Sequence, residues 1–155
     1  MITVSQTKDH ELIAALNEEV QNLHHALHPA IFKRFDKEAT TAAIKDFMTD
    51  ANCMAYTVGE GEIIMGYAIF MVKEAKENAF HYTIRTLYID QICVLQQYRR
   101  SGAGALLMQQ AEQVAKELSI SRLELDHWSA NTVAAAYFRK NGYTLCKERL
   151  CKLIE

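Results

Sequence analysis

The residues with the clearest chemical potential lie in the stretch "VLQQYRRSGAGALLMQQAEQVAKEL", residues 94–118. Gly102 and Gly104, two of only six glycines in the chain, stand one residue apart at the start of a helical pattern, and Arg99 and Arg100 precede them. The first turn of a helix leaves backbone N–H groups unpaired, with a partial positive charge. Because glycine has no Cβ, an anion can approach those groups closely. The stretch therefore predicts a phosphate-binding cradle.

Several motifs share this appearance. A P-loop requires Gly-Lys-Ser/Thr, whereas Ala105, Leu106 and Leu107 follow here, so that motif is excluded. A dinucleotide-binding fingerprint requires a third glycine where Leu107 stands, although Glu124 lies 20 positions after Gly104, as a ribose-binding acid would. Only about 50 residues follow Gly104, too few for the rest of a doubly wound domain. From this motif alone, a plain tight turn before a helix stays open as an alternative.

The segment "LELDHWSANTVAAAYFRKNGY" supplies a second motif. Its landmarks are Trp128, Asn131, Ala134, the pair Tyr137-Phe138 and the pair Gly142-Tyr143. Together with "VLQQYRRSGAG", which has the pattern Arg/Gln-x-x-Gly-x-Gly/Ala after a strand ending in valine, it resembles the GNAT superfamily of acetyl-CoA-dependent N-acetyltransferases. The resemblance covers almost the whole chain, strongly from about Tyr88 to Leu145 and weakly before Cys53. It implies a GNAT-like fold, in which the fourth and fifth strands of a mixed sheet splay apart.

The resemblance also implies how acetyl-CoA is bound. The pantetheine arm would lie in the gap between the splayed strands, against the backbone of residues 92–94, and an N–H of this strand would polarise the acetyl carbonyl. Backbone N–H groups from Arg100 to Ala105 would hold the pyrophosphate. The residues expected at the cofactor are Ile92, Cys93, Val94, Arg99, Arg100, Ser101, Gly102, Ala103, Gly104, Ala105, Asn131 and Phe138.

The reaction that the resemblance implies is attack by a neutral amine on a thioester. A primary amine with a pKa near 10.4 is unprotonated in only ~1 in 10³ molecules at pH 7, so a general base is useful. Asp90, two residues before Ile92 and expected on the same strand face, is the first candidate and would act through water; a solvated strand-end carboxylate is the alternative. His127 is a second candidate, although packing beside Trp128 explains this histidine equally well.

The general acid is where the chain departs from the family pattern. Many relatives carry, at the position of Phe138, a tyrosine that protonates the departing thiolate. In this chain Tyr137 stands one place earlier, about 100° around the helix. We therefore expect Tyr137 or water to donate the proton. The same substitution keeps open a second class of function, a GNAT-like domain that binds acyl-CoA without turnover.

The family binds its acceptor mainly with the first two helices and their loops, so "LHHALHPAIFKRFD" would form the acceptor wall. His28, Phe32 and Asp36 are the expected substrate contacts, and Asp36 could receive a cation. A small-molecule amine, a polyamine, an amino-sugar antibiotic or a protein amino group are all compatible with this wall. The mild negative charge of the chain slightly favours a cationic acceptor. A homodimer is a further expectation from the family.

Hydrophobic periodicity predicts the elements that position these residues. Thr7 or Asp9 would cap the first helix, and Pro29 would end it. A charged turn, "KEAKEN", would separate the third and fourth strands. The expected order β-α-α-β-β-β-α-β-α-β-β defines a mixed α/β (α+β) sheet with helices on both faces. Its elements are a strand at 1–5, helices at 7–28 and 37–48, two strands within 53–72 around "GEGE", a strand within 80–94, a helix at 102–118, a strand at 120–128, a helix at 131–142 and one or two strands within 143–155.

Composition limits the remaining possibilities. The chain of 155 residues fits one N-acetyltransferase domain over residues 1–155. A net charge of −2 gives no indication of nucleic acid, and the absence of a long apolar run predicts no membrane partner and a cytoplasmic location. The four cysteines have no CxxC spacing and are expected as free thiols. His24 and His28 share a helix face, but no third ligand follows, so no metal is expected.

Overall fold

A computed structural model describes all residues, 1–155, and places a five-stranded sheet at the centre of the chain. The strands are ordered β1-β2-β3-β4-β5; β4 pairs with β5 in parallel, and the other neighbours are antiparallel. Their bounds are β1 Thr3–Thr7, β2 Cys53–Glu60, β3 Ile63–Ala75, β4 Ile84–Val94 and β5 Leu123–Glu124. The prediction of a mixed sheet is confirmed.

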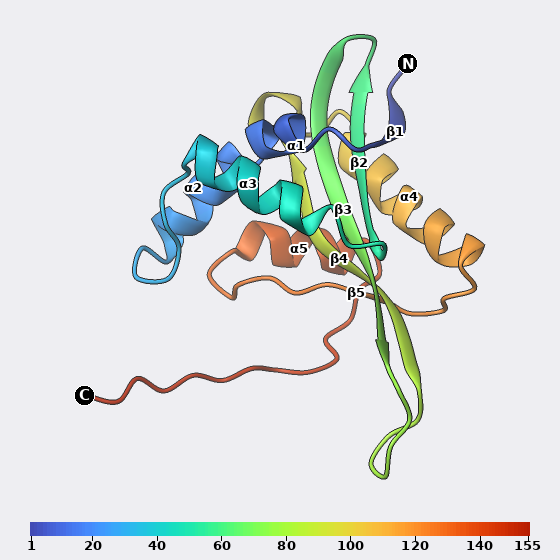
Figure 1. The fold of residues 1–155 in the computed structure, drawn as a ribbon. Coiled ribbons are helices and arrows are strands. Elements are labelled where there is room, and N and C mark those ends of the chain that lie inside the picture. Colours follow the sequence, from blue (N-terminus) through green and yellow to red (C-terminus); the bar gives the residue numbers. More distant parts are fainter.

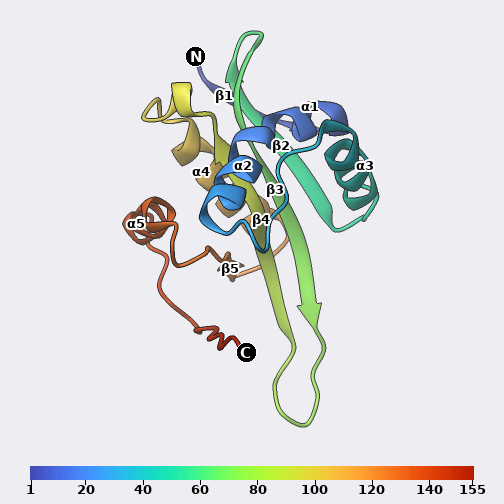
Figure 2. The same ribbon diagram turned by 90° about the vertical axis from the view of Figure 1, so that its left-hand side faces the viewer.

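Helices cover both faces of this sheet, with α1–α3 on one face and α4 and α5 on the other (Figures 1 and 2). Their bounds are α1 His10–Leu16, α2 Glu18–Leu27, α3 Lys37–Phe47, α4 Ala103–Glu117 and α5 Thr132–Lys140, with a 3-10 turn at Gln96–Tyr98. Side chains alternate along β3: Tyr67 and Ile69 are buried against α1 and α3, whereas Ala68 and Phe70 belong to the core under α4 and α5. The sheet therefore separates two cores.

The predicted single helix over residues 7–28 is wrong, because the helix breaks at Asn17. Asp9 caps α1 by accepting the Leu12 N–H at 2.9 Å, as one of the two expected caps. Asn17 is buried, and its side-chain amide donates to the Tyr67 hydroxyl at 3.0 Å and to the side-chain oxygen Oε1 of Gln91 at 3.3 Å. These bonds to β3 and β4 fix the corner between α1 and α2, so α2 runs in a new direction across the sheet.

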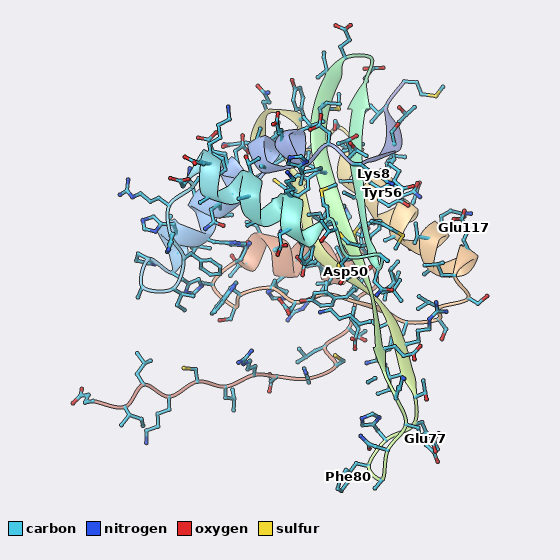
Figure 3. All side chains as sticks on the ribbon, in the orientation of Figure 1. Lys8, Asp50, Tyr56, Glu77, Phe80 and Glu117 are labelled. Carbon is cyan, nitrogen blue, oxygen red and sulfur yellow. The ribbon has the colours of Figure 1, made fainter.

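The β3–β4 connection is longer than the predicted turn. β3 continues to Ala75 and β4 begins at Ile84, so the two strands form a ribbon that projects from the body (Figures 1 and 2). Glu77 and Phe80 lie at its far end (Figure 3). A two-stranded ribbon without a third strand buries little, and Phe80 is accordingly exposed. The far end of this ribbon, residues 76–83, takes no part in the site described below.

The C-terminal part of the sheet differs most from prediction. The expected strand at 120–128 pairs only at Leu87↔Leu123 and Tyr88↔Glu124, and the rest of that segment leaves the sheet. The predicted strands within 143–155 are absent, because residues 144–155 pair with no strand and run away from the body (Figure 1). Their leucines and isoleucine are exposed. The observed order is β-α-α-α-β-β-β-α-β-α.

Candidate active site

The edge of β4 that faces away from β3 is open over half its length. Beyond the pairs Leu87↔Leu123 and Tyr88↔Glu124, the stretch from Ile89 to Val94 has no strand neighbour on that side. An unpaired strand edge presents backbone N–H and C=O groups that another extended chain can bind. This short pairing of β4 with β5, followed by separation, agrees with the predicted splayed strands.

The first turn of α4 follows β4 after a connection at residues 95–102, and it has unpaired donors. Gly102 caps α4 in a left-handed conformation, with φ +93°, and supplies no capping side chain. Arg100 is also left-handed, with φ +65°, and the Ser101 hydroxyl oxygen accepts the Ala103 N–H at 3.3 Å. The next two N–H groups of α4, at residues 104 and 105, donate to no backbone carbonyl. Successive free N–H groups beside an arginine form a concavity suited to an anion.

The Tyr137 hydroxyl of α5 reaches this same turn. A Cβ built on Gly104 would lie 2.8 Å from that hydroxyl oxygen and 3.7 Å from a methyl of Val94, so glycine is required for this close approach. The hydroxyl is enclosed and has no hydrogen-bond partner. Burial also raises the pKa of Tyr137, so the group remains a proton donor. This proton donor therefore stands where β4 ends and α4 begins, next to the free N–H groups of the turn.

β4 contains a bulge that redirects the candidate base. Ile69 pairs with Gln91 and Phe70 pairs with Ile89, which leaves Asp90 without a partner. Gln91 accepts from the Tyr67 hydroxyl at 2.8 Å on the α1–α3 face, whereas Ile89 is buried under α4 and α5. The extra residue lets two consecutive side chains point to one face.

As a result, Asp90 and Gln91 both face the α1–α3 side. Ile92, by contrast, packs on the core under α4 and α5. The expectation that Asp90 shares a strand face with Ile92 is therefore wrong, because the bulge interrupts the alternation of the strand.

The Asp90 carboxylate lies among other charged groups on that face. The Lys73 ammonium sits 3.5 Å from the centre of the Tyr88 ring, and the Tyr88 hydroxyl donates to Asp126 at 2.5 Å. Partial burial raises the pKa of Asp90, and nearby Asp126 raises it further, while Lys73 and a hydrogen bond with Gln91 lower it. A carboxylate with a raised pKa is a better proton acceptor for an amine than an ordinary aspartate.

Helix α2 spans the opening between β4 and the β5–α5 loop. Near its start, the Glu19 carboxylate accepts the N–H of Gln96, just after β4, at 2.8 Å. Just beyond its end, the centre of the His28 ring lies 4.6 Å from the centre of the Trp128 ring. The centre of the Phe32 ring lies 5.4 Å from the same indole, edge to face. Of the predicted acceptor contacts, His28 and Phe32 are thus brought together beside the opening.

The ring cluster around Trp128 also has buried polar atoms. His28 Nε2 is enclosed without a hydrogen-bond partner. The centre of the His24 ring lies 4.9 Å from the centre of the Phe32 ring. Burial is the larger cause that lowers the pKa of His24, and the neighbouring His28 is the smaller one. At neutral pH His24 therefore does not add a positive charge to this wall.

Other predicted site residues have structural contacts. Asp36 caps α3 by accepting the Ala39 N–H at 2.7 Å, and Asn131 caps α5 by accepting the Ala134 N–H at 3.2 Å. The His127 ring stacks on that of Phe138 at 6.2 Å, and Phe138 is only 8% exposed within the core. His127 itself is exposed, so only the Phe138 ring is buried, and that burial explains why this tyrosine position can hold phenylalanine.

Cys93 contributes to the strand by its backbone alone. Its side chain packs under α1 and α3, and burial raises the pKa of the thiol to about 11. Sequence reasoning did not predict that Asp126 contacts Tyr88 or that Trp128 contacts His28. The signal was present in the alternation of "LELDHW", in which every second side chain faces the same side.

No group of three or more histidine, cysteine, aspartate or glutamate side chains is arranged to hold a metal ion. None of the helices combines the length and the hydrophobicity that crossing a bilayer requires.

Comparison with known proteins agrees with this geometry. The mixed sheet in which β4 and β5 separate, with α4 beside them, has the fold of the GNAT acetyltransferases. A point mutant of the BH1408 protein from Bacillus halodurans superposes with a TM-score of 0.87 at 20% identity, covering 100% of this chain and 99% of that one. AAC(6')-Iy, in complex with the bisubstrate analog CoA-S-monomethyl-acetylneamine, superposes with a TM-score of 0.70 at 14% identity, covering 100% and 99%. Because the sequence identities are this low, the similarity to these structures shows the fold alone.

Sequence comparison identifies the family. The model of the acetyltransferase (GNAT) family matches residues 17–143, so the chain belongs to this family of acyltransferases. A candidate acetyltransferase of Bacillus subtilis (strain 168) is 33% identical over 60 residues, a segment that spans 39% of each of the two chains. The resemblance inferred from the two sequence motifs is therefore confirmed.

Proposed function

We propose that the protein transfers an acetyl group from acetyl-CoA to a primary amine of a small molecule, by direct attack within a ternary complex. The observation that carries this proposal is the pair of free N–H groups at residues 104 and 105 of α4, next to the edge of β4 that has no strand neighbour over residues 89–94. Both features lie where the open edge of β4 meets the first turn of α4. A ligand with a diphosphate and an extended amide-containing arm would satisfy all of these groups together.

Acetyl-CoA, as the second substrate, would bind along these two elements. The N–H groups of residues 100–105 would hold the diphosphate, and Arg99 and Arg100 would add positive charge outside the cradle. The pantetheine amides would pair with the open edge of β4 at residues 92–94, as a strand pairs with a sheet edge. An N–H of this strand would polarise the acetyl carbonyl, a contribution that typically changes the rate by about 10²–10³.

The proton transfers follow from the faces on which the residues lie. The amine nitrogen forms a bond to the acetyl carbon, and its proton leaves through water to Asp90, whose raised pKa suits it as a base. The carbon–sulfur bond then breaks. The departing thiolate takes the proton of the Tyr137 hydroxyl, which lies on the cofactor side of β4 and has no other partner.

A second candidate function is binding of acyl-CoA without turnover. The burial of Phe138 in the core favours it, because the position that carries the acid in many relatives has no hydroxyl here. Acetylation of a protein is less well supported. Helix α2 crosses the acceptor opening from Gln96 to Trp128, which suits a small amine better than a folded partner.

We further propose a cytoplasmic location and a homodimer. Four free cysteines, of which Cys146 and Cys151 are exposed, suit a reducing compartment. The exposed apolar residues of the segment 144–155 support self-association, because such side chains usually mark a contact surface.

Two measurements test the proposed activity. Calorimetry measures CoA binding, and a thiol-release assay with a panel of primary amines measures transfer. Gly102→Asp places a carboxylate at the cradle and should weaken CoA binding at least tenfold, because the negative charge opposes the diphosphate. Gly61→Asp is the matched control, since Gly61 is also left-handed and open but lies in the β2–β3 turn. Equal CoA affinity in wild type and Gly102→Asp contradicts the proposal, while binding without thiol release from any amine favours the second candidate.

A further inference from the structure

The extended segment after β5 presents two kinds of side chain to two faces. Leu125 packs against the core under α4 and α5, and His127 stacks on Phe138 of the same core. Asp126 and Trp128 point the other way, toward Tyr88 of β4 and toward His28. Asp126 and Trp128 therefore lie on the acceptor side of the gap, two residues apart, on the face to which the bulge directs Asp90.

The carboxylates on this face form no salt bridges. The salt bridges of the chain join the N-terminus to Glu60 and Arg122 to Glu124, and neither Asp90 nor Asp126 takes part in one. Asp126 accepts one hydrogen bond, from Tyr88, through its Oδ2 atom, and its other oxygen has no partner. The Lys73 ammonium offsets part of this charge from its place over the Tyr88 ring.

Trp128 adds a surface that attracts cations. It is 40% exposed, although His28 and Phe32 pack against part of the indole. The rest of the indole is open to a ligand. Indole is the best of the aromatic side chains for binding an ammonium group over its face.

We propose that Asp126 and Trp128 form a cation subsite at the acceptor opening, and that the acceptor carries a second, positively charged nitrogen besides the amine that is acetylated. This inference rests on the proposed acetyl transfer. The reacting amine must be neutral to attack, and its proton goes to Asp90. The Asp126 carboxylate and the Trp128 ring remain for a nitrogen that stays charged, which selects diamines and related small dications.

The test compares two acceptors with chains of equal length, the diamine 1,4-diaminobutane and the monoamine 1-aminopentane. Thiol release at saturating acetyl-CoA gives kcat and KM for each. We expect kcat/KM to be at least tenfold higher for the diamine. Asp126→Asn and Trp128→Leu should raise KM for the diamine at least fivefold and leave KM for the monoamine within twofold, whereas Trp128→Phe should retain part of the preference. Glu124→Gln removes the same charge from the same segment, beside Arg122, and should change neither acceptor.

The outcomes separate this inference from the proposed function. Transfer to both amines with equal kcat/KM, or an equal effect of Asp126→Asn on the two amines, overturns the cation subsite and leaves acetyl transfer intact. If no amine is acetylated, calorimetry of the diamine against the CoA-loaded protein decides. Binding that weakens in Asp126→Asn and Trp128→Leu, but not in Glu124→Gln, supports the subsite while the transfer fails. No binding of the diamine overturns the subsite.

Discussion

Replacing Tyr137 with phenylalanine separates the stability of the protein from its function. The hydroxyl is enclosed and unpaired in the free protein, and such a group costs about 1–3 kcal/mol of desolvation. Removing it while keeping the ring should therefore raise the free energy of unfolding, by about 1 kcal/mol. For a chain of this size that corresponds to a rise in Tm of about 2–4 °C, measured by circular dichroism.

The same substitution should weaken the interaction with CoA. If the hydroxyl donates to a phosphate oxygen or to the thiolate, its loss removes a hydrogen bond to a charged group, about 1.5–3 kcal/mol. We expect CoA affinity or kcat to fall roughly tenfold or more, measured by calorimetry and thiol release. Tyr143→Phe is the control, because Tyr143 lies in the same ring cluster but away from Gly104. Its CoA affinity should match that of wild type.

A double-mutant cycle with Gly104→Ala checks the geometry itself. The new Cβ would meet the Tyr137 hydroxyl at 2.8 Å, but the next atom of that ring lies at 3.4 Å, an ordinary contact. In wild type the clash with the hydroxyl should make Gly104→Ala destabilising. In Tyr137→Phe that clash is absent, and Gly104→Ala should be stabilising, because alanine is favoured over glycine in a helix by up to about 1 kcal/mol. The expected coupling in the free energy of unfolding is about 1 kcal/mol. Additive effects, together with a lower Tm and unchanged CoA affinity for Tyr137→Phe, would refute the reasoning.

Three further predictions concern other residues. In wild type, kcat/KM should rise with pH as the Asp90 carboxyl loses its proton, at a pH above the ordinary pKa of aspartate. Asp90→Asn should remove this acidic limb of the pH profile. A limb that persists in the variant excludes Asp90 as the base. The same variant should unfold at an equal or higher Tm at pH 7. A raised folded pKa means that the favourable contribution of Asp90 is present only below its unfolded pKa and is lost as the pH rises through the folded value. Alkylation of the native protein at pH 8 should modify two thiols rapidly and two slowly, because burial raises the pKa of the slow pair to about 11; four equal rates would contradict the burial. The fast thiols are Cys146 and Cys151, and the slow ones are Cys53 and Cys93.

Elements defined by nearby residues were predicted well from the sequence. The helix expected at 102–118 is observed at Ala103–Glu117, and the helix expected at 37–48 is observed at Lys37–Phe47. Their bounds follow from caps and from periodicity within a few turns, which depend on adjacent residues. The left-handed Gly102 and the free N–H groups that follow it are also local features of the backbone, and the binding of an anion there stays a prediction.

Features that depend on distant residues were not predicted. The break at Asn17 follows from hydrogen bonds to Tyr67 and Gln91, which lie 50 and 74 positions away along the chain. The bulge at Asp90 depends on the register between β3 and β4, which no pattern within β4 alone determines. The segment 143–155 was predicted to form strands from its own residues, but a strand also needs a partner, and this segment pairs with no strand of the sheet.

The sequence by itself determined the family and the order of most elements, because two motifs and local periodicity encode them. Only the tertiary structure decided that the Tyr137 hydroxyl meets Gly104, and that Asp126 and Trp128 turn toward the acceptor side. The physical reason is that these contacts join side chains from separate elements. Their meeting depends on the register of the sheet and the packing of helices on it, which short stretches of sequence do not specify.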